Sequence, residues 1–430
     1  MQPTPPQAVR GITGSLPDGS VVDITLFDDN GVSRVGGIRP HDAWAEDTSQ
    51  PDWLDLRGFV LTAAAAEPHA HLDKALSWSE LSPPLGDLGD AIASWRSGSV
   101  HLDEESFRRR ALQTATAMLR NGITAVRTHA DVLHDDDPLR AVRALADVRE
   151  QLRGLMTIQI AVLASPTTPT ALVEGALDAG ADLVGGAPHI ADDPLADVIR
   201  LLDLAEKRGI GADLHIDEFM DGDHLTIEAF ADRVADWPRD RIRTAGHCSR
   251  LATLPPADLQ RVARTLTRAS VSVIALPITN LYLQGRHGPS AGRRGITAID
   301  ALRDAGVLVA AGADNVRDPF NPVGRADPLE TAALLVAAAH QSPDTALELV
   351  TDSARAVLGL EPAGPQVGAR ADFLAVRGTD VVDTIATAPA DRVVIVNGAI
   401  VARTETTSWT AAPAAAIDSI SRTHRVMENK

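Results

Sequence analysis

The sequence predicts an α/β fold: a (β/α)₈ TIM barrel with a small β-sandwich domain formed from both ends of the chain. Three observations indicate this fold. Short apolar strands alternate with amphipathic helices through the middle of the chain, which is typical of a parallel sheet. Eight such strands fit within about 250 residues, the usual size of a TIM barrel. Both ends instead contain short alternating stretches with glycine and aspartate turns, which are typical of a β domain.

We expect residues 1–58 and 369–404 to form the two parts of the small β domain, 59–368 to form the barrel, and 405–430 to form a polar tail. Barrel strands are expected at Phe59–Ala65, Ile123–Thr128, Thr157–Leu163, Asp182–Gly185, Gly211–His215, Arg241–Gly246, Val271–Leu276 and Val307–Ala311. Helical spacing predicts helices over Ser106–Arg120, Asp137–Leu152, Thr170–Ala179, Asp193–Arg208, Pro256–Arg268 and Ala298–Ala305. An open doubly wound sheet is the alternative arrangement of these elements.

Composition and charge restrict the class of protein. Of the 430 residues, 44% are hydrophobic, which is enough for a sizeable core. The formal net charge of −18 predicts repulsion from nucleic acid and anionic membranes, so neither is expected as a partner. Cys248 is the only cysteine, which excludes an internal disulfide and a cysteine-based zinc site. The N-terminal residues lack the apolar segment of a signal peptide, and we expect a cytoplasmic homo-oligomer.

Polar residues that suit catalysis follow the expected strands, at the end where a TIM barrel has its active site. His69 and His71 follow the first strand, and side chains two residues apart on an extended segment point the same way. His215 lies at the end of the fifth strand, and Asp314 follows the eighth. A buried carboxylate among histidines is costly unless it is paired or bound to a metal. Three imidazoles and one carboxylate suit zinc or ferrous iron.

Each histidine taken alone is equally compatible with an ordinary hydrogen-bonded barrel residue, and the metal site is predicted from all of these positions together. Lysine occurs only at Lys74, Lys207 and Lys430. None of them lies at the end of the fourth strand, in Gly185–His189, where barrels with two metals need a bridging carboxylate, usually a carbamylated lysine. We therefore expect one divalent metal ion, Zn²⁺ or Fe²⁺.

Six segments carry a family resemblance: Glu67–Lys74, Val126–Val132, His215–Glu218, Asn280–Arg286, Arg293–Thr297 and Asp314–Pro319. The Leu-Gln-Gly-Arg sequence at 283–286 and the Arg-Arg-Gly-Ile-Thr sequence at 293–297 are far more specific than the histidines alone. On these segments the chain resembles the cytosine deaminase branch of the amidohydrolase superfamily, roughly from residue 55 to residue 403.

The resemblance implies a role for each matching residue. His69, His71, His215 and Asp314 would hold the metal, Glu218 would shuttle protons, and His247 would lie beside the metal-bound water. Gln159 matches the residue that hydrogen-bonds the amide edge of the substrate in cytosine deaminases. Such an edge needs both a donor and an acceptor, and a glutamine side chain offers both.

Three further residues, His189, Asn315 and Phe320, are expected near the substrate. Asn315 stands where bacterial cytosine deaminases carry a second aspartate, and Phe320 stands where a tryptophan is usual. Asparagine donates as well as accepts hydrogen bonds, so the change at Asn315 affects which ring is preferred. Cytosine is therefore one candidate among pyrimidines, purines, triazines and creatinine-like rings.

The predicted function is metal-dependent hydrolytic deamination of a small amino-substituted nitrogen heterocycle. Metal-bound hydroxide would attack the ring carbon that bears the amino group. Glu218 would protonate the ring nitrogen, Asp314 would accept the proton of the attacking water, and ammonia would leave. One alternative is hydrolysis of a cyclic amide or an N-alkylamino heterocycle. The other is a non-catalytic metal-binding scaffold, against which Glu218 argues, since a scaffold needs no proton carrier.

Overall fold

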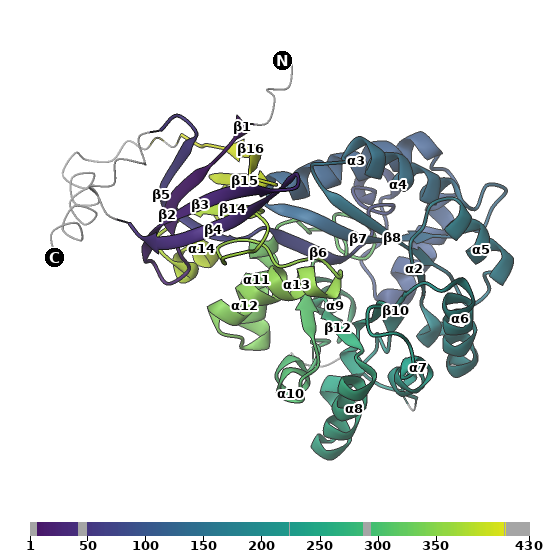
Figure 1. The fold of residues 1–430 in the computed structure, drawn as a ribbon. Helices are drawn as coiled ribbons and strands as arrows, with labels where there is room; N and C mark the ends of the chain where they lie inside the picture. The colour runs from purple at the N-terminus through teal and green to yellow at the C-terminus, as the bar shows by residue number, and fades with distance from the viewer. Residues whose placement is uncertain (1–6, 42–49, 223, 287–293, 408, 410–430) are drawn as a thin grey trace.

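The structure, a computed structural model, describes residues 7–41, 50–222, 224–286, 294–407 and 409. Figure 1 shows two parts: a sheet built from the purple and yellow ends of the chain, and a larger part in which helices surround parallel strands. Most of the expected tail, 405–430, lies outside the described residues, as does Arg293.

One hydrogen-bonded sheet of eight strands joins the two ends of the chain, in the order β1-β16-β15-β14-β5-β2-β3-β4. Its strands are β1 Gln7–Ala8, β2 Gly11–Ser15, β3 Val21–Asp29, β4 Val32–Pro40, β5 Trp53–Ala63, β14 Phe373–Arg377, β15 Arg392–Val396 and β16 Ala399–Thr404. β14 pairs antiparallel with β5, and β1 pairs antiparallel with β16. The two ends of the chain therefore meet in one sheet, as the alternating stretches predict.

The larger part contains eight strands within the described residues, in two parallel sheets. They are β6 Ala65–Ala70, β7 Ile123–Asp131 and β8 Thr157–Leu163, then β9 Val184–Gly186, β10 Ala212–Ile216, β11 Arg243–His247, β12 Ser272–Ala275 and β13 Val309–Ala311. Isolated parallel bridges lie between the two sheets on both sides: Ala161 to Leu183 and Ala164 to Gly186 on one side, and Ala70 to Asp314 on the other. Neighbouring strands follow chain order, as in a TIM-barrel-type fold.

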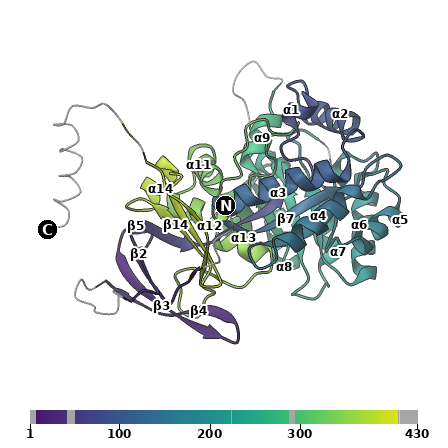
Figure 2. The same ribbon diagram turned by 90° about the horizontal axis from the view of Figure 1, so that it is seen from above.

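Helices cover the outside of these strands (Figure 2). They are α1 Trp78–Leu81, α2 Leu88–Ser99, α3 Glu104–Arg120, α4 Arg140–Gln151, α5 Thr170–Asp178, α6 Pro194–Arg208, α7 Thr226–Val234, α8 Pro256–Ala269, α9 Pro277–Leu283, α10 Ile299–Asp304, α11 Pro328–Ala339, α12 Pro343–Val350 and α13 Asp352–Val357, with α14 Val381–Thr387 in the terminal domain and 3₁₀ turns at Pro188–Ile190 and Ser249–Thr253. Within the described residues, no helix combines the length and the apolar character that crossing a bilayer requires.

The helix α6 shows how local sequence sets these boundaries. The side chain of Asp193 accepts a hydrogen bond from the backbone N–H of Ala196, and Pro194 occupies the first turn, where its missing N–H costs nothing. Gly209 ends the helix in the left-handed region, with φ 70°. The predicted helix, Asp193–Arg208, matches the observed one to within a residue.

The first barrel strand begins later in the chain than the sequence predicts. Residues Phe59–Ala63 belong to β5, where they pair with β14 in the terminal sheet. Only Ala64 separates β5 from β6. Every residue from Phe59 to Ala66 is buried, so the apolar pattern gives no sign of where one sheet ends and the next begins.

A buried ion pair fixes the terminal sheet to the barrel-type part. Arg392 of β15 donates to both carboxylate oxygens of Asp327, at 2.9 and 2.8 Å, just before α11. The same guanidinium donates to the carbonyl of Asn121, at the end of α3. Apolar side chains of the terminal sheet join the same buried cluster as the barrel residues, namely Leu374, Val376 and Val394. One face of the terminal sheet therefore packs into the core of the barrel-type part, whereas residues such as Ile12, Ile24 and Phe373 form a separate core within the terminal sheet.

Candidate active site

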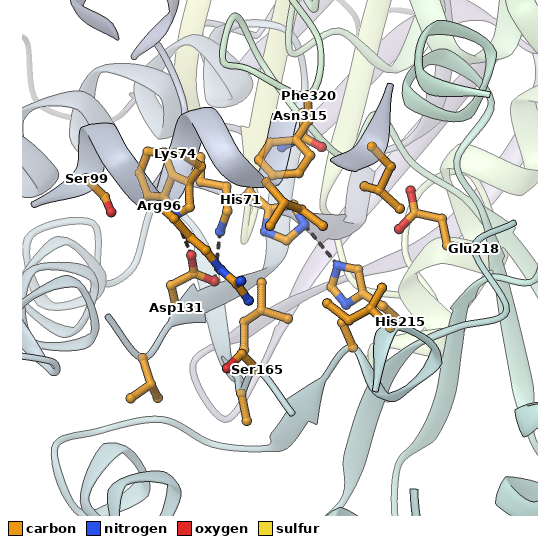
Figure 3. A pocket seen from close by; sticks show the side chains of 18 of the residues that line it. His71, Lys74, Arg96, Ser99, Asp131, Ser165, His215, Glu218, Asn315 and Phe320 are labelled. Carbon is orange, nitrogen blue, oxygen red and sulfur yellow. Dashed lines mark hydrogen bonds and ion pairs between the residues drawn. The ribbon is translucent and has the colours of Figure 1, made fainter. Parts of the chain in front are cut away.

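Four buried side chains lie at the carboxyl ends of barrel strands. His69 lies near the end of β6 and His71 directly after it, His215 lies in β10, and Asp314 follows β13. Because the strands are parallel, their carboxyl ends meet on one face. Figure 3 shows the rings of His71 and His215 pointing toward each other. Residues far apart in the sequence thus meet at one point.

The donor atoms of these side chains are close enough to share one ion. His215 Nε2 lies 3.2 Å from Nε2 of His69 and 3.2 Å from Nε2 of His71. Asp314 Oδ1 lies 3.1 Å from His71 Nε2 and 3.9 Å from His69 Nε2. Ligands bound tetrahedrally to one zinc ion at about 2.0–2.2 Å lie roughly 3.3–3.6 Å apart. The observed separations bracket that range.

The polar atoms of the cluster have few other partners. Within the described residues, neither carboxylate oxygen of Asp314 accepts a hydrogen bond, and Nδ1 of all three histidines is without one. Burial lowers the pKa of His69, His71 and His215 well below the usual value, so the neutral rings keep a lone pair for a ligand bond. Burial, with the nearby Glu218, raises the pKa of Asp314 well above its usual value. A divalent cation would stabilise the carboxylate, so the donor set fits a metal.

The backbone turns sharply at two of the strand ends. His247 and Asp314 have φ of 67° and 66°, in the left-handed region that costs a residue with a Cβ about 1–2 kcal/mol. Strain of this kind persists where the surrounding structure holds it, often at functional sites. Gly246 gives room for the neighbouring ring, because a Cβ there would lie 2.9 Å from Cε1 of His69.

Glu218 and His247 lie next to the predicted metal ligands. Glu218 Oε1 lies 3.4 Å from His247 Nδ1, and the side-chain amide of Asn280 donates to both atoms, at 3.4 and 3.2 Å. If Nδ1 of His247 accepts this hydrogen bond, its proton is on Nε2, which faces Asp314 Oδ2 at 4.0 Å. Burial raises the pKa of Glu218 to about 8. The group therefore holds a proton at neutral pH.

His189 supports the same corner of the site. Its Nδ1 donates to the backbone carbonyl of His215 at 3.0 Å, and its Nε2 lies 3.9 Å from Glu218 Oε2. Burial lowers the pKa of His189 to about 4, so the ring is neutral at pH 7. The neutral ring adds no positive charge that would favour ionisation of Glu218.

A pocket opens onto the cluster. His71, His215, Glu218, His247 and Asp314 form its polar end. His189, Asn315 and Phe320, the residues expected near the substrate, also line it. Its walls are largely apolar and include Leu88, Ile92, Val132, Leu133 and Leu163. An apolar pocket with a few convergent polar groups suits a small planar molecule with one reactive edge.

Comparison with known proteins identifies the family. The sequence model of the family described as "Amidohydrolase family" matches residues 86–402, which is most of the chain. The chain belongs to the amidohydrolase family.

Three similar proteins relate this chain to particular amidohydrolases. Pterin deaminase of Rhizobium rhizogenes is 29% identical over 411 residues, covering 93% of this chain and 92% of the relative. The crystal structure of 5-methylcytosine deaminase from Klebsiella pneumoniae with 5-fluorocytosine has a TM-score of 0.82 at 26% identity, covering 93% of this chain and 99% of that one. That of N-isopropylammelide isopropylaminohydrolase from Burkholderia multivorans has a TM-score of 0.74 at 28% identity, covering 92% and 99%.

These comparisons confirm the resemblance to the cytosine deaminase-like branch. They also show that the chain is a hydrolase that acts on carbon–nitrogen bonds. The TIM-barrel-type fold with a second domain agrees with the structures of these relatives.

This amidohydrolase does not place Gln159 where the resemblance implies. Gln159 lies in the first half of β8 and does not line the pocket, which this strand reaches only at its last residue, Leu163. Its carbonyl oxygen accepts from Arg127 at 3.0 Å, and its amide nitrogen donates to the carbonyl of Leu358 at 2.8 Å. Both polar groups of Gln159 are thus engaged inside the barrel. The side chain supports the strands and is not positioned to meet a substrate.

A layer of polar side chains lies beneath the predicted metal ligands. Arg127 and Asp213 are fully buried and form an ion pair at 2.6 Å. The other oxygen of Asp213 lies 3.6 Å from Nε2 of His129 and 4.0 Å from Nδ1 of His69. The ring of His129 lies 4.1 Å from that of His69, between centroids. This layer restricts how the first ligand can move.

Sequence reasoning missed the other end of the pocket. At this end Lys74 pairs with Asp73 and with Asp131, each at 3.1 Å, and lines the pocket. Trp95 of α2 donates from its indole N–H to Asp131, and Lys74 Nζ lies 5.1 Å from the centre of the Trp95 ring. The sequence contained a signal for this end of the pocket, because Asp131 is a polar residue at the end of the second barrel strand.

Proposed function

We propose that this amidohydrolase is a metal-dependent deaminase that hydrolyses a small amino-substituted nitrogen heterocycle. The observation that carries the proposal is the convergence of His69, His71, His215 and Asp314, with donor atoms 3.1–3.9 Å apart, beside the buried Glu218. Two relatives support the reaction class, since one is named a pterin deaminase and another a 5-methylcytosine deaminase.

The same proposal takes a closed (β/α)₈ barrel as the scaffold. The bridge from Ala161 to Leu183 supports closure on one side, and the bridge from Ala70 to Asp314 supports it on the other. The second bridge has a chemical consequence. It brings Asp314 against the strand that carries His69, so that ligands from the first and last strands become neighbours.

One divalent ion, Zn²⁺ or Fe²⁺, would be held by the three histidines and Asp314. When bound, such an ion lowers the pKa of a water molecule to about 7 and so supplies the nucleophile at neutral pH. His247 would donate from Nε2–H to the attacking oxygen, since its Nδ1 accepts from Asn280. Asp314 would take the proton that the water gives up and pass it to the departing nitrogen.

Glu218 would protonate the ring nitrogen next to the carbon under attack. Its proton is available at neutral pH because burial raises its pKa to about 8. The transfer relieves the negative charge that builds up on the ring as the carbon–oxygen bond forms. The carbon–nitrogen bond then breaks and the new hydroxyl group returns its proton to Glu218, so one water is consumed, one ammonia is released, and the ring keeps a carbonyl in place of the amino group.

The test is a screen for ammonia release, using protein whose zinc and iron contents have been measured. Aminated pyrimidines, purines, triazines and pteridines are the substrates, and the Glu218→Gln protein with matched metal content is the control. Ammonia production by the wild-type protein, but not by Glu218→Gln, supports the proposal. Release of an alkylamine from N-alkylaminotriazines, without ammonia from any ring, would favour the activity named for the Burkholderia relative. A metal-loaded protein that releases neither would contradict the proposal.

A further inference from the structure

The helix α2, Leu88–Ser99, turns one face toward the pocket. Its residues at positions 88, 92, 95, 96 and 99 all line the pocket, a spacing that corresponds to one side of an α-helix. Leu88, Ile92 and Trp95 supply apolar surface, whereas Arg96 supplies a guanidinium. Figure 3 shows Arg96 on the side of the pocket away from Glu218, with His71 and His215 between them.

Two cations line this side of the pocket, and their surroundings differ. Lys74 is buried, and its ammonium lies 3.1 Å from a carboxylate oxygen of Asp73 and 3.1 Å from one of Asp131. Although burial lowers the pKa of Lys74, the charges of Asp131 and Asp73 outweigh it and raise the pKa. Lys74 is therefore charged, and its ammonium is already paired with two carboxylates of the protein.

The charge of Arg96 is not balanced in this way. Arg96 is exposed and lines the pocket, and within the described part of the chain its guanidinium forms neither an ion pair nor a hydrogen bond. Most arginines of this chain have the opposite environment, as Arg140 does with Asp135 and Arg143 with Glu104. Asp131 is the carboxylate at this end of the pocket, and its described contacts are with Lys74 and Trp95 rather than with Arg96.

We infer that Arg96 binds an anionic substituent, of the carboxylate class, on the ring edge opposite the amino-bearing carbon. This inference rests on the proposed deaminase function, because the metal ligands and Glu218 fix which edge of the ring reacts. The opposite edge then faces α2. A guanidinium binds a carboxylate through two parallel hydrogen bonds, which gives orientation as well as affinity. The preferred substrate is therefore an aminoheterocycle that carries a carboxylate, rather than the uncharged ring.

The experiment compares matched pairs of rings. Pterin and pterin-6-carboxylate, and cytosine and cytosine-6-carboxylate, are assayed for ammonia release with the wild-type protein, Arg96→Gln and Arg153→Gln. Arg153→Gln is the matched control, because it removes one positive charge at an exposed ion pair with Glu150. We expect the wild-type protein to prefer the carboxylated ring. Arg96→Gln should raise KM for that ring by about 10–100-fold, which corresponds to the loss of one charge-assisted bidentate contact.

Arg153→Gln should leave KM for both rings unchanged, and Arg96→Gln should change KM for the uncharged ring much less than KM for the carboxylated ring. Added salt should raise KM for the carboxylated ring in the wild-type protein and have little effect in Arg96→Gln. An unchanged KM for the carboxylated ring in Arg96→Gln, or a wild-type preference for the uncharged ring, would overturn the inference.

A binding measurement separates this inference from the proposed function. Titration calorimetry records the binding of pterin-6-carboxylate and cytosine-6-carboxylate to each protein without any turnover. If no ring releases ammonia, the deaminase proposal fails. Weaker binding of a carboxylated ring to Arg96→Gln than to Arg153→Gln would then still support an anion-binding Arg96, and equal or undetectable binding would refute it.

Discussion

Glu218 and His247 lie 3.4 Å apart, between Oε1 and Nδ1, and a single amide, that of Asn280, donates to both. This contact links the expected proton carrier to the residue that faces Asp314. It also orients His247, because the ring nitrogen that accepts from Asn280 leaves the other one to carry the proton.

Replacement of Glu218 by glutamine should remove the proton carrier and leave the fold intact. The two side chains have nearly the same shape, and the buried amide removes an ionisable group rather than adding one. We expect kcat to fall by about 10²–10⁴-fold, with unchanged metal content and an unchanged melting temperature. Steady-state kinetics and metal analysis measure these quantities. A near-native kcat in the substituted protein would exclude Glu218 from proton transfer.

The pH dependence of kcat should report the same carboxyl group. Burial raises the pKa of Glu218 to about 8, so the protonated form that can donate predominates at pH 7 and is lost as the pH rises through 8. We expect kcat to fall about tenfold per pH unit on the alkaline side. A pH–rate profile of the wild-type protein measures it. The residual activity of Glu218→Gln should lack this alkaline decline. If the decline persists in Glu218→Gln, a group other than Glu218 causes it.

The His215→Asn protein should lose the metal. His215 is the imidazole whose Nε2 lies 3.2 Å from the same atom of both His69 and His71, so its removal opens the centre of the donor set. The metal content should fall from about one ion per chain to nearly none, with activity lost in parallel. Elemental analysis after dialysis measures it. His101→Asn, at a histidine far from the cluster in the sequence, should keep the ion, and retention by both proteins would disprove this ligand set.

Substitution of Gly246 by alanine tests how tightly the first ligand is held. The added Cβ would lie 2.9 Å from Cε1 and 3.0 Å from Nδ1 of His69, closer than normal contact allows. The ring must shift, so we expect metal affinity to fall by about 10–100-fold, the range seen when groups supporting a ligand are disturbed. Competition with a chelator measures the affinity. Gly37→Ala, where the nearest atom is 3.4 Å away, is the control and should bind metal normally.

The ion pair beneath the metal ligands should contribute strongly to stability. Arg127 is fully buried and donates to Asp213, Gln159, Thr244 and the carbonyl of Val357. Arg127→Met leaves the carboxylate of Asp213 buried without its partner, so we expect a loss of about 3–5 kcal/mol in the free energy of unfolding. Urea denaturation measures this loss. Arg153→Gln, at an exposed pair, should unfold at the wild-type midpoint, and equal midpoints for both variants would contradict the prediction.

The sequence predicts most of the barrel strands and helices because apolar periodicity and caps act locally. The helix after Asp193 is an example, since its cap, its proline and its terminal glycine are adjacent in sequence. The position of the first strand could not be predicted in this way. Phe59–Ala66 is buried without interruption, and the passage from one sheet to the other depends on which strands lie beside it.

The candidate site shows the same division. The convergence of His69, His71, His215 and Asp314 could be predicted because a TIM-barrel-type fold brings strand ends together, whatever the details of packing. The role of Gln159 could not, because it depends on depth along the strand: Gln159 lies four residues before Leu163, where this strand reaches the pocket. Arg96 was missed for another reason. It lies on a helix that the alternation of strands does not predict, and only the folded chain brings α2 over the pocket.

The single residue between β5 and β6 restricts where this enzyme can be truncated or fused. Ala64 is the whole spacer between a strand bordered by β14 and the strand that ends at the His69–His71 pair. Deleting β14 to β16 would remove the strand that pairs with Phe59–Ala63, the segment of β5 directly before Ala64 and β6. A minimal catalytic core cut at the barrel boundary should therefore lose its metal before it unfolds, and both flanking segments belong in any shortened or fused version.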